Sequence, residues 1–257
     1  MNLQSVLVEQ TGHVLTVTLN RPEQRNAFDD PMRREMGDLW THVRDDRSVR
    51  CVVLTGAGKG FCAGADMGVL DGERSPLGDG IDDELCFLPG RRLDVPVVVA
   101  VNGVCAGGGL HYVADADIVI ASEDAWFTDP HVGVGQVSGI EAPSLGLRVP
   151  LGMLARMVLL GRHERWDAQQ ARELGLVSEV LPADQLLPRA HELAGWIAEA
   201  SPEAVRRSRA VYRRFEEGVV AEAMADGWDW VQRHWSHPDS DEGPRAFVER
   251  RDPEWHP

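Results

Sequence analysis

The chain has 257 residues with 26 basic and 41 acidic side chains, so its formal net charge is −15. A protein that neutralises phosphates along a nucleic acid needs a basic field, so this charge argues against a nucleic-acid partner. Hydrophobic residues make up 43% and charged residues 26% of the chain, a balance typical of a globular protein with a sizeable core rather than of disorder.

The cysteines and the first residues favour a cytoplasmic protein. The four cysteines form no CxxC pair, so neither a disulfide scaffold nor a zinc site is expected. Residues 1–10 lack the basic and apolar regions of a secretory signal. The uncharged stretch Val95–Leu110 contains a proline and four glycines, which predicts a buried strand and a glycine loop rather than a membrane span.

Hydrophobic periodicity predicts an α/β fold. Strands are expected at Val6–Glu9 and His13–Leu19, around a tight turn, and a helix with one apolar face over 32–43. Three short apolar runs are typical of buried strands, at Cys51–Thr55, Val97–Val101 and Ile118–Ala121. Because helical patterns alternate with these runs, we expect a parallel sheet with right-handed crossovers.

The second half of the chain is mostly helical in pattern. A polar, glycine-rich surface loop is expected over 67–80, and the chain from about Leu151 onward has helical periodicity. Three amphipathic segments follow, at Ala183–Ala200, Pro202–Glu217 and Val219–His234. We place a subdivision near Ser201, which gives a core over 1–200 and a C-terminal region over 201–257.

Two glycine-rich loops follow two of the buried strands, over 56–66 and 102–110. Small residues at such a position let the backbone approach a ligand with free N–H groups. Two loops side by side could point one N–H each at a single oxygen and form an oxyanion hole. The alternative is that both are only tight connections. Neither loop has the spacing of a nucleotide-binding fingerprint.

The motifs of the chain resemble the enoyl-CoA hydratase/isomerase (crotonase) superfamily, in order and over nearly the whole length. The matching segments are Leu19-Asn20-Arg21-Pro22 with Asn26-Ala27-Phe28, Phe61-Cys62-Ala63-Gly64-Ala65-Asp66, Ala100-Val101-Asn102-Gly103 with Gly107-Gly108-Gly109, Leu174-Gly175-Leu176-Val177, and the tail from Ser240 to Arg251. The resemblance implies an α/β crotonase-like spiral of ββα units, with C-terminal helices that assemble trimers or hexamers.

The same resemblance implies an acyl-CoA thioester as substrate, with coenzyme A as part of it, no separate cofactor and no metal. The Ala65 and Gly108 N–H groups would hold the thioester oxygen, and the Ala63 carbonyl would receive the adenine. Phe247 and Arg250 match positions that reach a neighbouring subunit's CoA. The residues expected to contact substrate or CoA are Arg25, Ala27, Lys59, Ala63, Asp66, Met67, Gly107, Glu141, Phe247 and Arg250.

The two catalytic glutamates of the family's hydratases are replaced here. Their positions hold His111, two residues after the glycine triplet, and His131, after Pro130. An imidazole can take or give a proton near neutral pH, because its ordinary pKa is about 6.5. We therefore interpret the two histidines as the acid and the base of a working site. The alternative is that they are polar lining residues of a site that has lost its chemistry.

Three further features near His131 bear on the reaction. Glu141 could supply a carboxylate to the pocket or orient His131, or it could be only a first-turn helix acid. The position of a dehalogenase's nucleophilic aspartate holds Val137, which counts against dehalogenation. A β-diketone hydrolase branch shares the Pro-His pair at 130–131 but lacks the intact glycine triplet that this chain keeps.

These observations favour hydration of an enoyl-CoA, or the reverse elimination, with His111 and His131 in the place of the glutamates. Hydrolysis of a thioester or of a carbon–carbon bond beside a ketone, and a catalytically silent acyl-CoA binder, remain alternatives. CoA is a polyanion, so an acidic protein must bind it through local charges. The candidates are Arg25, Arg250 and Lys59, which is the only lysine of the chain.

Overall fold

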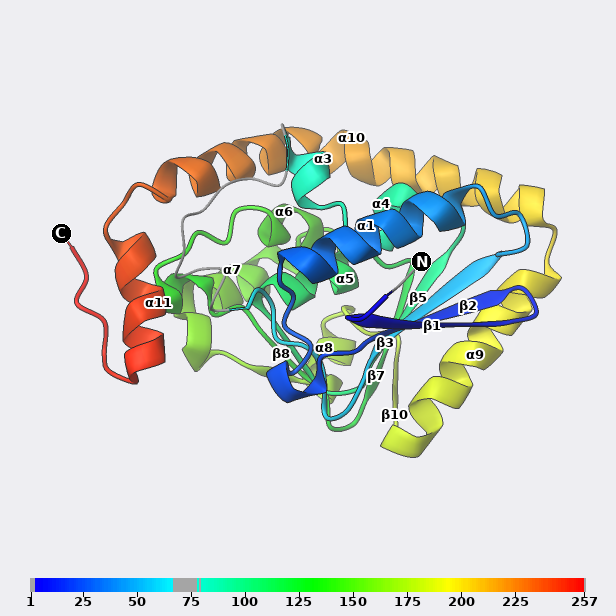
Figure 1. The fold of residues 1–257 in the computed structure, drawn as a ribbon, viewed down its shortest axis with the longest axis horizontal. Coiled ribbons are helices and arrows are strands. Elements are labelled where there is room, and N and C mark those ends of the chain that lie inside the picture. The colour runs from blue at the N-terminus through cyan, green and yellow to red at the C-terminus, as the bar shows by residue number, and fades with distance from the viewer. Residues whose placement is uncertain (1–2, 67–77, 79, 257) are drawn as a thin grey trace.

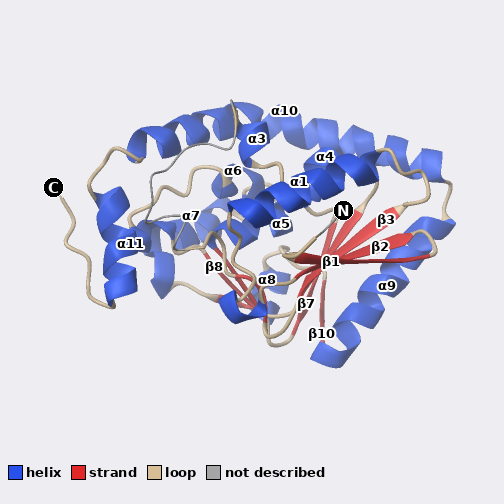
Figure 2. Cartoon of the chain, viewed as in Figure 1, coloured by secondary structure: helices blue, strands red, loops and turns tan. Residues whose placement is uncertain are grey.

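A six-stranded sheet forms the centre of the fold (Figures 1 and 2). The computed structural model describes residues 3–66, 78 and 80–256. An antiparallel hairpin at one edge is followed by four parallel strands. In spatial order the strands are β1 (Val6–Thr11), β2 (Val14–Leu19), β3 (Cys51–Gly56), β5 (Val97–Val101), β7 (Ile118–Ser122) and β10 (Glu179–Leu181).

A smaller four-stranded sheet was not expected from the sequence. Each of its first three strands follows a strand of the larger sheet after a short turn, so β3–β4, β5–β6 and β7–β8 are consecutive pairs. A helical segment follows each pair, and this repetition confirms the spiral of ββα units. The strands of the smaller sheet are β4 (Gly60–Cys62), β6 (Val104–Ala106), β8 (Trp126–Thr128) and β9 (Trp166–Asp167).

Helices cover both faces of the larger sheet (Figure 2). On one face, the side chains of Leu186, Ala190 and Ala194 from α9 pack against Val53 and Val98 of the sheet. The other face packs against α1 in the main hydrophobic cluster. The helices are α1 (Asp30–Arg44), α3 (Ile81–Glu84), α4 (Pro89–Arg92), α5 (Leu110–Asp115), α6 (Glu141–Leu145), α7 (Leu151–Leu160), α8 (Ala168–Glu173), α9 (Ala183–Glu199), α10 (Pro202–His234) and α11 (Asp239–Glu249).

The long helix α10 corrects one prediction. The segments expected at Pro202–Glu217 and Val219–His234 form a single helix that continues through Gly218. A glycine inside a helix costs only about 1 kcal/mol relative to alanine, which the rest of the helix readily offsets. The helix runs along one edge of the molecule (Figure 1) and packs against α3 and α6.

Residues of α10 belong to the same hydrophobic cluster as the larger sheet. Val220, Met224 and Trp228 are buried in that cluster, so the helix is part of the wall of the core. A division of the chain near residue 200 stays a prediction. Of the helices in the described ranges, none is long and apolar enough to cross a membrane.

Candidate active site

The first glycine loop is bonded to the segment before α1 and lies close to the second glycine loop. A parallel bridge joins Phe28 to Ala65, with the Phe28 N–H donating to the Gly64 carbonyl and the Asp66 N–H to the Phe28 carbonyl, both at 2.9 Å. Gly64 has a φ of +94°, and a Cβ on it would lie 3.0 Å from the Gly108 nitrogen. Only glycine fits here, because any side chain would separate the loops.

This bridge leaves the Ala65 N–H unused, since its two hydrogen bonds come from the neighbouring residues on each side. Gly108 is the second residue of the 3-10 turn over Gly107–Gly109, and the N–H groups of a helix's first residues have no acceptor within the helix. Both residues line one cavity of about 440 Å³. The arrangement offers two backbone donors to a single oxygen, the geometry of an oxyanion hole.

The two histidines line the same cavity as these donors. His111 is the second residue of α5, directly after the glycine turn, and is buried. His131 opens a 3-10 turn after β8. A Cβ on Gly107 would lie 3.6 Å from the His131 ring, so the ring lies beside the loop that carries the Gly108 donor. The histidines therefore come from two successive ββα units and meet at one site.

A carboxylate lies between the two imidazole rings. The Glu141 Oε1 atom is 3.0 Å from the His111 Nε2 and 3.5 Å from the His131 Nε2. Glu141 is both a residue of the cavity lining and the first residue of α6, so the two alternatives considered for it from the sequence are compatible. Glu141 thus contacts both histidines with one oxygen atom.

Asp129 completes a chain of four side chains. Its Oδ1 atom lies 2.5 Å from the His131 Nδ1 and also accepts from the His131 N–H at 3.1 Å. The Ser138 hydroxyl donates to the other carboxylate oxygen. Asp129 is 1% exposed, and its contacts fix the His131 ring. The order of the chain is Asp129, His131, Glu141 and His111.

The charges within this chain shift two pKa values in opposite directions. Burial disfavours the charged form of His131, but the Glu141 and Asp129 carboxylates outweigh it and raise the pKa of His131 to about 10. Burial alone would raise the pKa of Glu141, yet the imidazoles of His111 and His131 hold it well below its usual range. His131 is therefore an imidazolium and Glu141 a carboxylate at neutral pH.

Several other predicted residues also line the cavity, and three do not. The cavity lining includes Ala27, Ala63, Asp66, Gly107 and Phe247 as well as the residues above. Arg25, Lys59 and Arg250 are exposed and are not part of that lining. Met67 lies outside the described residues.

Sequence reasoning gave Arg21 no role, although it was part of a matched motif. Its guanidinium lies 3.0 Å from carboxylate oxygens of both Asp29 and Asp66, and it donates to the Ala27 carbonyl. Arg21 thus ties the end of the first glycine loop to the segment before α1. The charge pair with Asp66 could not be predicted from the sequence, because the two residues are 45 positions apart.

The C-terminal helices supply an apolar wall that was also missed. Trp228, Val231 and Trp235, from α10 and its end, line the cavity together with Phe247 of α11. Phe247 is 59% exposed and so lies at the mouth. It lines the cavity of its own chain, and the contact with a neighbouring subunit's CoA stays a prediction.

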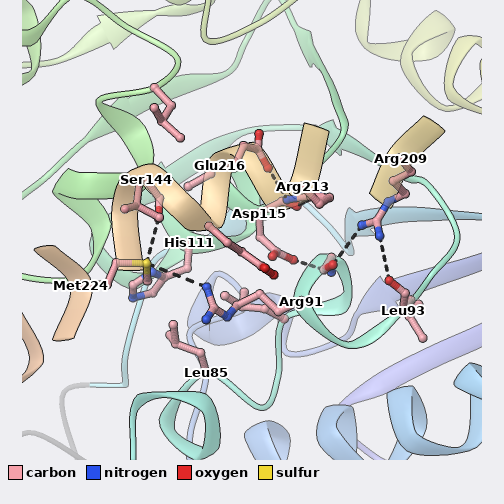
Figure 3. A pocket seen from close by; sticks show the side chains of 16 residues that line it. Leu85, Arg91, Leu93, His111, Asp115, Ser144, Arg209, Arg213, Glu216 and Met224 are labelled. Carbon is pink, nitrogen blue, oxygen red and sulfur yellow. Dashed lines mark hydrogen bonds and ion pairs between the residues drawn. The ribbon is translucent and has the colours of Figure 1, made fainter. Parts of the chain in front are cut away.

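A second cavity, of about 160 Å³, also has His111 in its lining (Figure 3). Its charged lining comes from α4, α5 and α10 and includes Arg91, Asp115, Arg209 and Arg213. Asp115 lines this cavity and is not part of the lining of the larger one. In the ranges with described coordinates, no three His, Cys, Asp or Glu side chains are grouped to hold a metal ion.

Comparison with known proteins identifies the family to which the chain is similar. The family model for enoyl-CoA hydratase/isomerase matches residues 9–257. Mevalonyl-coenzyme A hydratase sidH of Aspergillus fumigatus is 38% identical over 96% of this chain and 93% of its own length. Carnitinyl-CoA dehydratase of Proteus mirabilis is 35% identical over 98% of both chains.

Solved structures agree with the sequence relatives. EchA1_1 from Mycobacterium paratuberculosis has a TM-score of 0.88 and 33% identity over 99% of both chains. Carnitinyl-CoA hydratase from Mycobacterium avium has a TM-score of 0.88 and 31% identity, again over 99% of both. The resemblance drawn from the motifs is confirmed, and the chain belongs to the enoyl-CoA hydratase/isomerase family of enzymes.

Proposed function

We propose that the chain adds water across the double bond of an enoyl-CoA, or catalyses the reverse elimination, through an enolate-like thioester intermediate. The observation that carries this proposal is that the backbone N–H groups of Ala65 and Gly108, which have no acceptor among the described residues, share one cavity with two histidines. Donors aimed at a carbonyl oxygen stabilise the negative charge that develops there when the neighbouring carbons react. The proposal agrees with relatives that are named a hydratase and a dehydratase of acyl-CoA compounds.

The two histidines would divide the acid and base work. His131 carries a proton at neutral pH, because its pKa is raised to about 10, so it is suited to donate a proton to the α carbon. If His111 gives its Nε2 proton to the hydrogen bond with Glu141, its Nδ1 keeps a lone pair that can accept a proton from water. We assign His131 as the acid and His111 as the base of hydration.

The remaining part of the substrate would be held by the loop around the oxyanion hole and by nearby charges. The Ala63 carbonyl is proposed to receive the adenine, and Ala27, Asp66 and Gly107 lie on the same cavity. Arg25, Lys59 and Arg250 are proposed to contact the CoA portion from outside the cavity lining, and Met67 is proposed as a further contact.

The first experiment separates hydration from the other activities. Crotonyl-CoA incubated with the enzyme should lose the absorbance of its conjugated thioester, while a thiol reagent detects no free CoA. Release of the CoA thiol instead would favour thioester hydrolysis. If neither signal changes and crotonyl-CoA still raises the melting temperature, the chain is a binder without this activity.

One observation favours hydrolysis as the second candidate. The carboxylate of Asp129 is hydrogen-bonded to the Nδ1 of His131, and an acid–histidine pair of this kind can activate a nucleophile. It could act on a thioester or on a carbon–carbon bond beside a ketone. The raised pKa of His131 works against it, because a protonated imidazole is a poor base.

We also propose that the chain forms a homotrimer, or a hexamer of two trimers, in the cytoplasm. Large exposed apolar side chains on the C-terminal half support an assembly, because burying them is favourable. They are Leu151, Leu159, Val211, Phe215, Val219 and Trp230. Light scattering of the purified protein would give the mass, and a monomeric mass would contradict the assembly.

A further inference from the structure

The side chain of Arg21 contacts both of the segments that meet beside the oxyanion hole. Its Nη2 atom lies 3.0 Å from the Asp29 Oδ2 and 3.0 Å from the Asp66 Oδ2, and its Nη1 donates to the Ala27 carbonyl. Ala27 and Asp29 belong to the segment before α1, and Asp66 directly follows Ala65 in the first glycine loop. One guanidinium therefore joins the two segments beside the Ala65 N–H.

We propose that Arg21 is a positioning residue of the oxyanion hole, which holds the Ala65 N–H at the place where it donates to the thioester oxygen. This inference rests on the oxyanion hole of the proposed function and adds a residue on which that hole depends. Arg21 is not part of the cavity lining, so it acts through the glycine loop and not on the substrate.

The backbone alone holds the Ala65 donor with an isolated bridge. The Phe28 N–H donates to the Gly64 carbonyl and the Asp66 N–H to the Phe28 carbonyl, and neutral bonds of this kind are weak in net terms. An oxyanion donor must lie about 2.7–3.1 Å from the charged oxygen, and a misplacement of about 1 Å can lower a rate about a hundredfold. The donor therefore needs a further restraint.

Arg21 supplies this restraint because it is itself fixed. The Asp29 carboxylate contacts Arg21 through Oδ2, while its Oδ1 accepts from the Met32 N–H at 2.9 Å and caps α1. Charge-assisted hydrogen bonds are about twice as strong as neutral ones, and a planar guanidinium holds several acceptors in fixed directions. The N-terminus of α1 thus fixes Arg21, and Arg21 fixes Asp66 at the end of the glycine loop.

A purely electrostatic role for Arg21 is the alternative. The Asp66 carboxylate lines the cavity, and its negative charge disfavours an enolate unless a cation lies beside it. Any cation of the right reach would serve, including a lysine. The contacts favour positioning, because two of the three acceptors of Arg21, the Ala27 carbonyl and Asp29, lie on the segment opposite Asp66.

The first test measures the enolate of bound acetoacetyl-CoA. This β-keto thioester loses an α proton to give an enolate with a near-ultraviolet band, so a pH titration of the band gives a pKa for the bound ligand. When the ligand is fully bound, the midpoint does not depend on the amount of active protein. We expect Arg21→Met to raise this pKa by about one unit or more, because a displaced donor stabilises the enolate less.

The matched control is Arg189→Met. Arg189 also contacts two carboxylates, those of Glu179 and Glu192, and its side chain is 26% exposed against 19% for Arg21. None of these three residues lines the larger cavity. The pKa of bound acetoacetyl-CoA should stay within about 0.2 units of wild type. A rise as large as that in Arg21→Met would overturn the assignment, since the loss of any such guanidinium would then have the same effect.

Arg21→Lys separates position from charge. Lysine keeps the positive charge and lacks the planar fork, so this variant should keep at least about half of the rise in pKa seen in Arg21→Met. A return to the wild-type pKa would show that charge alone is needed, and the positioning role would be wrong.

Hydration kinetics give the second readout. Arg21→Met should lower kcat for crotonyl-CoA about tenfold or more with KM changed by less than about threefold, because the bond to the oxyanion is stronger in the transition state than in the ground state. A raised KM with wild-type kcat would place Arg21 in substrate binding instead and contradict the inference.

Asp29→Ser keeps the inference testable if Arg21→Met does not fold. Serine is as good a helix N-cap as aspartate but is too short to reach Arg21, so α1 keeps its cap while Arg21 loses its anchor. The pKa of bound acetoacetyl-CoA should rise by about half a unit. Removal of a negative charge would by itself lower this pKa, so an unchanged or lower value overturns the positioning role.

The proposed hydration and the role of Arg21 fail in different ways. If wild type does not hydrate crotonyl-CoA but lowers the pKa of acetoacetyl-CoA in a way that depends on Arg21, hydration is wrong and the positioning role stands. If wild type hydrates crotonyl-CoA and the Arg21 variants keep the wild-type pKa and kcat, the positioning role alone is wrong.

Discussion

The two cavities that share His111 in their linings lie near carboxylates with different partners. In the larger cavity, Glu141 contacts two histidines. Around the smaller one, Asp117 accepts from the guanidinium of Arg209 at 2.9 Å and is also paired with Arg213. A guanidinium keeps its charge at all ordinary pH values, while an imidazole gains and loses a proton near neutrality. The difference agrees with a structural role for the arginine pairs and with the proton transfer proposed for the histidines.

The pKa directions follow the same division. Asp115 lies beside the smaller cavity, where burial raises the pKa of its carboxyl and Arg213 only partly offsets the effect. In the larger cavity the two imidazoles lower the pKa of Glu141 despite its burial. The carboxyl of Glu141, beside the two histidines, therefore holds its negative charge more strongly than the carboxyl of Asp115 does. The following variants test the two regions one at a time.

The largest effect is expected on the arginine side. Arg209→Ala removes one of the two guanidinium partners of Asp117 and also leaves the Leu93 and Gly90 carbonyls without their donor. Breaking a buried pair in this way costs about 3–5 kcal/mol of unfolding free energy. Urea unfolding measures the loss, and Arg47→Ala, which breaks an exposed pair with Asp94, should cost less than about 1 kcal/mol. Equal losses in the two variants would show that Arg209 does not hold α10 in place.

The second effect belongs to the histidine side. His111→Ala and His131→Ala should each lower kcat for hydration at least about a hundredfold, because each removes one partner of the proton transfer. That loss corresponds to about 2.7 kcal/mol of activation free energy. Both variants should keep a melting temperature that allows the assay. An unchanged rate in either one removes that ring from the mechanism and makes it a lining residue.

A smaller effect concerns the pH dependence of stability. The folded state raises the pKa of His131 to about 10, so His131 contributes stability that is fully present below about pH 6.5 and lost as pH rises through about 10. Asp129→Asn removes one of the two carboxylates that raise this pKa, and it should cost about 1 kcal/mol at pH 7 and less at pH 10. Melting temperatures between pH 6 and 10 measure the change. In a His131→Gln background this pH dependence should vanish, and its persistence would assign it to another group.

The buried strands were predictable because their apolar runs are continuous. The prediction Val97–Val101 matches β5, and Cys51–Thr55 falls one residue short of β3. The smaller sheet was missed because β4, β6 and β8 have three residues each. Three residues are too few to show the alternation of apolar and polar side chains that is typical of a strand. Gly218 was taken as a break because it is a poor helix residue, but it lies in open space on α10 and costs little.

The candidate site was predictable in part. The glycine loops and the two histidines could be identified by motif, and they line one cavity. The chain through Asp129 and Glu141 could not, since α6 must turn back toward α5 before Glu141 can touch both rings. That approach depends on tertiary packing, and tertiary packing cannot be read from the hydrophobic periodicity of the sequence.

The smallest effect concerns a charge outside both cavities. Lys59 is exposed in the turn between β3 and β4 and is not part of the cavity lining, so it can attract a polyanionic CoA only through solvent. Lys59→Ala should raise KM for crotonyl-CoA by about two- to fourfold, and the effect should shrink as salt rises. Arg44→Ala, another exposed cation, is the control and should change KM less. Because Lys59 touches no reacting group, kcat should stay at the wild-type value. An equal change in the two variants would mean that binding depends on net charge alone, while a fall in kcat would place Lys59 with the proton-transfer residues of the larger cavity.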